Sequence, residues 1–332
     1  MYRVPEKNFW KGREDVIDGS YGLRWHQKVR LYSLLDKEKI TTQNTTETTF
    51  ALMGFASDEG VRRNQGRTGA SEAPNVLRSY LANLPWHFED INLCDMGNMF
   101  CLGEFLEDAH TDLAEGVSFL LEKNCRTILL GGGHEIAYGH YLGLKNHLIA
   151  KNTRLGVINF DAHFDMRESW ENKATSGTPF LQIARDLEKH EKTFNYMVLG
   201  VQKQSNTPRL YQMAKQWGVD YIEAEDLQTN EPNEIILQKI QNFIDKQDII
   251  YLSICLDVFS AAYAPGVSAP NAMGLSPWIV AKLIKKIAQS GKVIALDIAE
   301  LNPTYDIDGQ TARLAANLVF IYVDACSKIN IS

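Results

Sequence analysis

Short apolar runs alternate with longer stretches of helical hydrophobic spacing over most of the chain. From residue 48 onward, each apolar run is rich in β-branched or aromatic residues, and longer amphipathic stretches separate the runs. Such alternation is typical of a parallel sheet, because the connections between parallel strands place helices over both of its faces. The pattern therefore predicts an α/β fold whose strands are buried on both sides.

Eight of the apolar runs have the length and composition of strands. They are TTFALMGFA (48–56), INLCDMGN (91–98), RTILLGGG (126–133), RLGVINFDAH (154–163), FNYMVLGVQ (194–202), VDYIEAED (219–226), DIIYLSICLDVF (248–259) and KVIALDIAE (292–300). The stretches between them predict helices at residues 103–123, 135–150, 233–244 and 276–289. Residues 1–47 are polar and rich in threonine near their end, and we expect an N-terminal extension, a helix and a loop, ahead of the sheet.

Composition favours a globular protein that acts on a small molecule. The 332 residues, 45% of them hydrophobic, contain no repeat and no long Pro/Gly/Ser linker, so we expect one domain over residues 1–332. A net charge of -7 without a basic block argues against nucleic acid or an anionic membrane as a partner. The five cysteines lack CxxC spacing, and no apolar run reaches the roughly 18 residues of a membrane span. We therefore expect a soluble protein of the reducing cytoplasm.

Polar residues gather where the predicted strands end. The clusters are GGGHE (131–135), DAHFD (161–165), CLD (255–257) and DIAE (297–300), and each lies at the carboxyl end of a predicted strand. In open α/β sheets, ligands bind in the crevice beyond the carboxyl ends of the strands. Four separate clusters therefore predict a single site at that edge of the sheet.

The DAHFD cluster predicts a metal site. Asp161, His163 and Asp165 alternate along the chain, so their side chains emerge on one side if the extended geometry persists. Crowded carboxylates repel unless a cation or protons neutralise them, and imidazole with carboxylate suits Mn, Fe, Co or Zn. His134 and Asp257 arrive at the same edge, which favours one or two metals over a solvated loop with structural histidines. Because five groups are too many for a tetrahedral ion, two ions sharing an activated water are favoured, which indicates hydrolysis.

Two other side chains at this edge need separate interpretations. Glu300 is placed to accept hydrogen bonds from a positively charged substrate group, and the alternative is an ordinary surface carboxylate. Cys255 lies two residues before Asp257 and so faces the same side of its strand. A thiol in an apolar strand is most often a small buried hydrophobe, but a nearby divalent cation favours the thiolate and makes it a candidate ligand.

The ordered motifs resemble the ureohydrolase family of arginases and agmatinases over about residues 50–325. They are GGGHE, DAHFD, SGTPF (176–180), SICLDVFSAAYAPG (253–266) and DIAELNP (297–303). Two further segments, GVRRNQGRTGA (60–70) and APGVSAP (264–270), most resemble the formimidoylglutamase branch. The resemblance implies an arginase-like three-layer α/β/α domain with an eight-stranded parallel sheet and a dinuclear manganese centre. It also implies hydrolysis of N-formimidoyl-L-glutamate to L-glutamate and formamide in histidine degradation, and assembly into a homo-oligomer.

The resemblance also implies roles for individual residues. Asp161 matches an aspartate that bridges two ions, Asp165 one that binds metal and handles a proton, and Glu300 the carboxylate that holds the cationic amidine. Phe180 stands where arginases carry a proton-shuttling histidine, which favours the formimidoylglutamase branch. The full set of expected metal ligands is His134, Asp161, His163, Asp165, Cys255 and Asp257.

Cys255 departs from the family pattern, which has another bridging aspartate at this position. We expect two Mn²⁺ sites, the first of them weakened if the sulfur does not bridge; thiolate softness makes Zn²⁺ or another divalent ion the alternative. The two carboxylates of the substrate call for cationic or amide donors, and the candidates are Arg167, Arg63 and Asn64. The alternative for each arginine is an ordinary salt bridge on the surface. Agmatinase or guanidinobutyrase activity stays open, as does a metal-depleted, non-catalytic homologue that serves as a binding or regulatory subunit.

Overall fold

The structure is a computed structural model that describes residues 1–40, 47–151, 153–169, 171, 173–228 and 233–328. Its sheet has ten strands in the order β1-β4-β3-β5-β10-β9-β6-β7-β8, with β2 also paired to β4. The strands are β1 (Tyr2–Arg3), β2 (Arg30–Leu31), β3 (Thr48–Ala56), β4 (Ile91–Phe100), β5 (Arg126–Leu130), β6 (Leu155–Phe160), β7 (Asn195–Val201), β8 (Asp220–Glu223), β9 (Ile249–Cys255) and β10 (Val293–Ala299). The eight predicted strands are all present and pair in parallel, which confirms the prediction.

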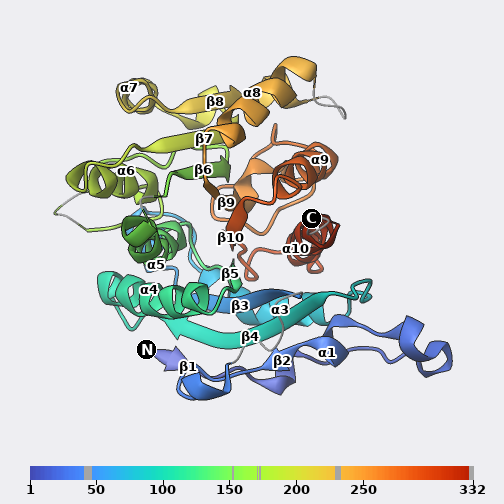
Figure 1. The fold of residues 1–332 in the computed structure, drawn as a ribbon. Coiled ribbons are helices and arrows are strands. Elements are labelled where there is room, and N and C mark those ends of the chain that lie inside the picture. The colour runs from blue at the N-terminus through green and yellow to red at the C-terminus, as the bar shows by residue number, and fades with distance from the viewer. Residues whose placement is uncertain (41–46, 152, 170, 172, 229–232, 329–332) are drawn as a thin grey trace.

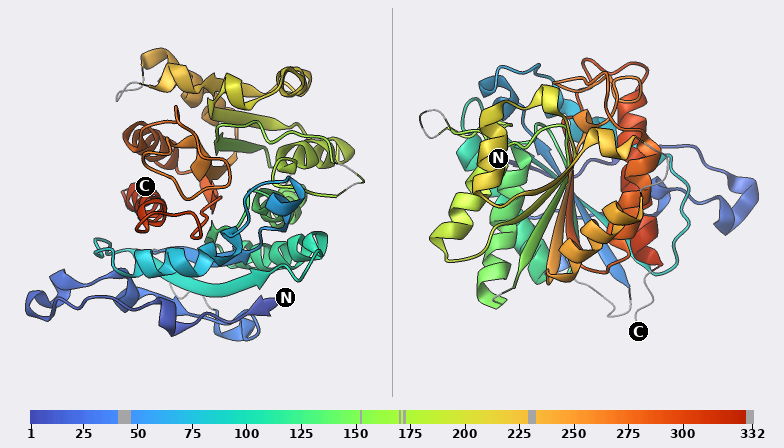
Figure 2. Two further views of the ribbon diagram at one scale, coloured as in Figure 1. Left: turned by 180° about the vertical axis from the view of Figure 1, so that it is seen from behind. Right: turned by 90° about the horizontal axis from the view of Figure 1, so that it is seen from above.

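Helices cover both faces of the sheet, as Figure 1 and the view along the sheet in Figure 2 show. One face carries α4 (Leu106–Glu122), α5 (Ile136–Lys151), α6 (Pro179–Lys189) and α7 (Pro208–Gln216). The other carries α3 (Ala73–Ala82), α8 (Glu234–Asp245), α9 (Pro277–Ala288) and α10 (Gln310–Ser327). Two short helices, α1 (Trp25–Lys28) and α2 (Glu59–Arg63), precede α3. The 3₁₀ turns are η1 (Lys7–Phe9), η2 (Val16–Gly22), η3 (Lys37–Lys39), η4 (Ala70–Glu72), η5 (Lys203–Ser205), η6 (Ala224–Leu227) and η7 (Leu256–Val258). The three-layer α/β/α architecture expected from the sequence is confirmed.

A separate hydrophobic core lies on each side of the sheet. Leu52 of β3 and Ile128 of β5 belong to the cluster that also contains residues of α3 and α10. Their strand neighbours Met53 and Leu129 belong to the other cluster, with residues of α4 and α5. Successive strand side chains point to opposite faces, so a strand covered on both faces is mainly apolar on both. This is why the strands could be recognised as continuous apolar runs.

The N-terminal segment contains the short helix α1 and also two short strands that were not expected, while its threonine-rich end at residues 41–46 lies outside the described residues. Its two short strands extend the sheet beside β4, where Tyr2 pairs with Met99 in antiparallel register. Trp10 and Trp25 are buried in the cluster around α3. The Trp10 indole Nε1 donates a hydrogen bond of 2.7 Å to Asp95 Oδ2. A strand of two residues has no periodicity to detect, so the sequence pattern did not predict this addition.

The strand order brings the four polar clusters together. β5, β10, β9 and β6 are consecutive neighbours, and each is followed by one of the clusters. In the β9–β10 ladder Ser253 pairs with Asp297. Within the described part of the chain, none of the helices is both long and apolar enough to span a membrane.

Candidate metal centre

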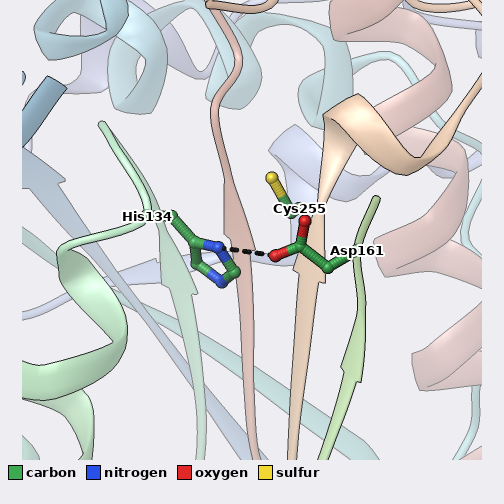
Figure 3. A group of neighbouring side chains, drawn as sticks. All are labelled: His134, Asp161 and Cys255. Carbon is green, nitrogen blue, oxygen red and sulfur yellow. Dashed lines mark ion pairs between the residues drawn. The ribbon is translucent and has the colours of Figure 1, made fainter. Parts of the chain in front are cut away.

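Two overlapping triads of metal-ligating side chains lie at the carboxyl edge of the four neighbouring strands. The first triad is His134, Asp161 and Cys255, which are all buried, and their donor atoms lie within 4.8 Å of one another. His134 comes from the turn between β5 and α5, Asp161 directly follows β6, and Cys255 is the last residue of β9. His134 Nδ1 lies 3.0 Å from Asp161 Oδ2. Figure 3 shows the imidazole facing this carboxylate, with the thiol next to both.

The second triad shares Asp161 with the first and adds His163 and Asp257. His163 Nδ1 lies 3.1 Å from Asp257 Oδ2 and 3.4 Å from Asp161 Oδ1. Asp257 Oδ1 is buried and has no hydrogen-bond partner, and a buried carboxylate oxygen in that state needs a proton or a cation. The donor set of carboxylate, imidazole and thiolate suits divalent first-row metals. The side chains therefore fit a pair of cations that share Asp161.

Charge in the cluster is arranged to attract cations. Burial lowers the pKa of His134, but Asp161 and Asp165 outweigh that effect and raise the pKa well above its ordinary value. Burial raises the pKa of Asp165, and the adjacent charge of Asp161 raises it further. Burial, with Asp161 and Asp257, also raises the pKa of the Cys255 thiol. Ligation needs the unprotonated donors, so a cation that enters this cluster must displace protons from them.

The His134 ring is oriented by a buried chain of hydrogen bonds that the motif analysis missed. His134 Nε2 lies 2.9 Å from Ser253 Oγ, and the Ser253 hydroxyl donates 2.6 Å to Asp297 Oδ1. A carboxylate only accepts hydrogen bonds, so the Ser253 hydroxyl donates its hydrogen to Asp297. Its oxygen must therefore accept a hydrogen bond from His134 Nε2. The Nδ1 lone pair is then left for the triad, as in other metal-binding histidines. Ser253 precedes Cys255 by two residues on β9, so the two side chains share one face of the strand. This spacing was the sequence signal that could have placed Ser253 beside the site.

Backbone conformation also brings the site together. Asp165 and Glu300 have positive φ angles of 48° and 71°, which are uncommon for residues other than glycine and are concentrated at functional sites. β6 ends at Phe160, so the extended geometry assumed for the DAHFD cluster does not persist to Asp165. The chain turns instead, and Asp165 Oδ2 lies 2.9 Å from His134 Nδ1. Asp165 belongs to neither compact triad among the described residues.

The turn that carries His134 requires glycine. A Cβ on Gly132 would lie 1.7 Å from the Ser57 carbonyl oxygen, and one on Gly133 would lie 2.0 Å from Glu135 Oε2. The His134 amide donates 2.9 Å to Glu300 Oε1, and the Glu300 amide donates 2.8 Å to the Gly132 carbonyl. Burial, with the charges of Glu135 and Asp257, raises the pKa of Glu300 to about 8. These hydrogen bonds fix Glu300 beside the triads. The negative charges around it favour a positively charged group next to its carboxylate.

A cavity of about 320 Å³ opens beside both triads. Its wall includes the side chains of His134, His163, Asp165, Cys255, Asp257 and Glu300, together with Asn64, Gln65, Arg67, Arg167, Ser176 and Ser268 from other segments. A larger hollow of about 560 Å³ lies at the opposite end of the strands, near Lys145 and Arg154. Both of those cations are already paired, with Asp186 and Asp248, so the smaller cavity is the better candidate for a substrate.

The predicted substrate-binding residues do not all reach this cavity. Arg167 and Asn64 line it, but Arg63 does not. The Arg63 guanidinium is bound to Glu59 and Glu107 instead, and this geometry favours a role outside the cavity over the predicted contact with the substrate. Phe180 is buried, and its ring packs edge-on against His134 with centroids 5.4 Å apart. An apolar ring at this position has no proton to transfer.

Comparisons with known proteins find a matching family and similar chains. A family model described as "Arginase family" matches residues 48–323. A formimidoylglutamase of Clostridium tetani is 41% identical over 331 residues, which cover 99% of this chain and 97% of that protein. A formimidoylglutamase of Legionella pneumophila is 43% identical over 325 residues, 97% of each.

Solved structures show the same fold. The formimidoylglutamase of Bacillus subtilis superimposes with a TM-score of 0.75 at 25% identity and covers 87% of this chain and 90% of its own. A Trypanosoma cruzi formiminoglutamase with Mn²⁺ superimposes with a TM-score of 0.76 at 23% identity, over 86% of this chain and 96% of its own. The match to the family model, together with the motifs and the strand order, shows that the chain belongs to the arginase family.

Proposed function

We propose that this chain hydrolyses N-formimidoyl-L-glutamate to L-glutamate and formamide. The observation that carries the proposal is the division of charge in the cavity, which has buried carboxylates beside the metal triads and a guanidinium on its exposed side. A formimidoyl group is a cationic amidine, and the rest of the substrate carries two carboxylates. Relatives of nearly the same length that are named formimidoylglutamase support this choice.

Two divalent cations fit the centre, and the Mn²⁺ of the Trypanosoma cruzi relative supports manganese. His134, Asp161 and Cys255 would hold one ion, and Asp161, His163 and Asp257 the other. When bound, the ions would lower the pKa of a water molecule and so make a nucleophile available at neutral pH.

Glu300 and Asp165 act on the two ends of the scissile C–N bond. Glu300 is buried and fixed by backbone hydrogen bonds, so its carboxylate can hold the amidine cation without reorganising. Asp165 lines the cavity beside His134, where it is placed to pass a proton to the departing glutamate nitrogen. Phe180 packs against His134 and keeps water away from that side of the imidazole.

Arg167 is the candidate for the substrate carboxylates. Its side chain is exposed, lines the cavity and has no ion pair with the side chains that the structure describes. A Cβ on Gly177 would lie 2.9 Å from Arg167 Cδ and 3.3 Å from Asn64 Nδ2, so the guanidinium stem and the Asn64 amide lie over the same glycine. Guanidinium binds carboxylate through two parallel hydrogen bonds. The cationic tail of agmatine would meet this charge unfavourably, which favours formimidoylglutamate over agmatine.

The function is tested by release of formamide and glutamate. Manganese-loaded protein should hydrolyse formimidoylglutamate with a higher kcat/KM than agmatine or guanidinobutyrate under the same conditions. Faster hydrolysis of agmatine would contradict the assigned substrate. Fewer than two bound ions per chain, with no hydrolysis of any amidine, would support the metal-depleted, non-catalytic homologue instead.

Replacing Arg167 with alanine should raise the KM for formimidoylglutamate by about tenfold, because a charge-assisted bidentate contact is lost. The kcat should change little, since Arg167 lies away from the scissile bond in this assignment. Steady-state kinetics on formimidoylglutamate and on an N-alkylformamidine that carries no carboxylate provide the comparison. An equal rise in KM for both substrates would count against a carboxylate contact.

Replacing Cys255 with aspartate should increase manganese retention after dialysis by at least roughly tenfold and raise manganese-dependent activity. A carboxylate restores a hard oxygen donor on a longer stem, whereas thiolate favours softer ions such as Zn²⁺. Metal analysis by mass spectrometry measures the retention, and Cys255→Ser is the matched control that removes the thiol without adding a carboxylate. If Cys255→Asp holds no more manganese than the parent chain, the thiol is either a dedicated ligand or a packing residue.

A further inference from the structure

The exposed side of the substrate cavity is built from two segments that are far apart in the sequence. One is the loop after α2, which supplies Asn64 and Arg67, and the other supplies Arg167 and Ser176. The two segments touch where Asn64 Nδ2 donates 3.2 Å to Ser176 Oγ. The second segment is closed on itself by the Arg167 amide, which donates 2.8 Å to the Gly177 carbonyl. The distance between the segments therefore sets the width of the cavity on the side where carboxylates would bind.

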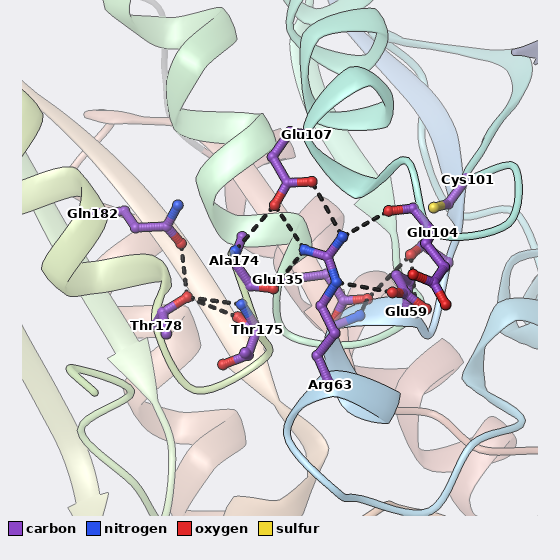
Figure 4. A network of polar contacts seen from close by, with 12 residues as sticks. Glu59, Arg63, Cys101, Glu104, Glu107, Glu135, Ala174, Thr175, Thr178 and Gln182 are labelled. Carbon is purple, nitrogen blue, oxygen red and sulfur yellow. Dashed lines mark hydrogen bonds and ion pairs between the residues drawn. The ribbon is translucent and has the colours of Figure 1, made fainter. Parts of the chain in front are cut away.

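Behind this wall, Arg63 ties three pieces of chain together, as Figure 4 shows: its own helix α2, the start of α4 and the turn at residue 174. Its Nη1 and Nη2 donate to the two Glu107 carboxylate oxygens at 2.6 and 3.2 Å, and its Nε donates 2.8 Å to Glu59 Oε1. Its Nη1 also donates 2.9 Å to the Ala174 carbonyl, and its Nη2 donates 2.6 Å to the Glu104 carbonyl. Glu107 Oε1 in turn accepts 3.0 Å from the Ala174 amide. Only 9% of the Arg63 side chain is exposed.

We propose that Arg63 is a positioning residue that holds the loop after α2 against the turn at residues 174–177 and so fixes the substrate cavity. This inference rests on the proposed function, since the cavity is taken to be the formimidoylglutamate site. Arg63 does not line the cavity, so it acts through Asn64, which follows it directly, and through Ser176, two residues beyond Ala174.

The charges of this cluster support a permanent tie at neutral pH. Burial raises the pKa of Glu107, but hydrogen bonds from Arg63 and from the Ala174 amide bring it to about 2. The pKa of Glu59 is also lowered, because Arg62 and Arg63 outweigh its burial. Both carboxylates are therefore ionised at neutral pH, and each of their bonds to Arg63 is charge-assisted.

The neighbouring arginine provides a matched control. Arg62 belongs to the same helix and also binds Glu59, with its Nε donating 2.6 Å to Oε2. Its second ion pair is with Glu104 at 3.1 Å, and half of its side chain is exposed, at 51%. It makes no hydrogen bond to the turn at 174–177 in the part of the chain that the structure describes. Removing Arg62 thus deletes the same charge from α2 without releasing that turn.

The experiment compares Arg63→Ala with Arg62→Ala in the full, manganese-loaded chain. Arg63→Ala should raise the KM for formimidoylglutamate by roughly tenfold, with less than a threefold change in kcat and unchanged manganese content. The same variant should speed amide hydrogen exchange in peptides that cover residues 173–178, while Arg62→Ala should change neither KM nor exchange there. Faster exchange at residues 173–178 alongside the KM rise would separate positioning from a direct carboxylate contact, which Arg167 is expected to make.

Three results would overturn the inference. Equal effects of Arg62→Ala and Arg63→Ala on KM would indicate a general charge effect, and a lower melting temperature with unchanged KM would indicate a purely structural role. Unchanged exchange at 173–178 would show that the turn does not depend on Arg63. If Arg63→Ala does not fold, Glu107→Gln replaces it as the test variant. Glutamine has nearly the same shape as Glu107 but no charge, so the bidentate pair with Arg63 is weakened, and KM and exchange should shift in the same direction as in Arg63→Ala. A parent chain inactive on formimidoylglutamate would contradict the proposed function, while the exchange comparison would still decide the role of Arg63.

Discussion

Replacing Asp161 with alanine should remove both metal ions and abolish hydrolysis. Asp161 is the one residue shared by the two compact triads found among the described side chains, so its loss breaks both. Its oxygens are oriented by the Asn159 amide at 3.0 Å and by the His163 backbone amide at 2.8 Å. Neither donor can replace a carboxylate as a ligand for a divalent cation. Metal analysis at equilibrium with excess Mn²⁺ should find two ions per chain in the parent and none in Asp161→Ala.

Asp257→Ala is the control for this result. Asp257 belongs to the second triad alone, so this variant should keep one ion per chain, held by His134, Asp161 and Cys255. Circular dichroism and melting temperature would verify that both variants fold. Two ions retained in Asp161→Ala, or the same loss in both variants, would contradict a centre in which Asp161 is shared.

The fold could be predicted largely from the hydrophobic pattern, but the neighbours of each strand could not. Every predicted strand is present. Because both faces of the sheet are covered, most strand positions are apolar and the strands stand out in the sequence. The order β5-β10-β9-β6 depends on long-range pairing, which local periodicity does not encode. It explains why Ser253 and Asp297, from strands about 40 residues apart in the sequence, pair and orient His134.

The site was predictable where a short motif carries its own chemistry. His134, Asp161, His163 and Asp257 could be grouped because each ends a predicted strand, and such ends share one edge of the sheet. The path of the chain after Phe160 was not predictable. The expectation that Asp161, His163 and Asp165 share one side assumed an extended chain, and the positive φ of Asp165 breaks that geometry. The roles of these residues as ligands stay predictions until metal binding is measured.

The arginines of the GVRRNQGR segment show where sequence reasoning ends. Arg62, Arg63 and Arg67 have the same chemistry, and no periodic pattern separates them. Burial separates them in the structure, because Arg63 turns inward to Glu107 and the Ala174 carbonyl. Arg67 lines the cavity but donates to the carbonyls of residues 267 and 268 and lies over the Tyr305 ring. Tertiary partners, and not the residue type, decide which guanidinium is available to a substrate.

Replacing Asp165 with asparagine should lower kcat by roughly 10²- to 10⁴-fold, the usual contribution of a positioned proton donor. Asparagine has almost the same shape and keeps an oxygen near His134, but it has no acidic proton to give to the departing nitrogen. Since Asp165 lies outside both compact triads of described donor atoms, manganese content and KM should change little. Single-turnover measurement of formamide release, alongside metal analysis, tests both statements. Near-normal turnover would remove Asp165 from catalysis, and a loss of manganese as large as that of Asp257→Ala would make it chiefly a ligand.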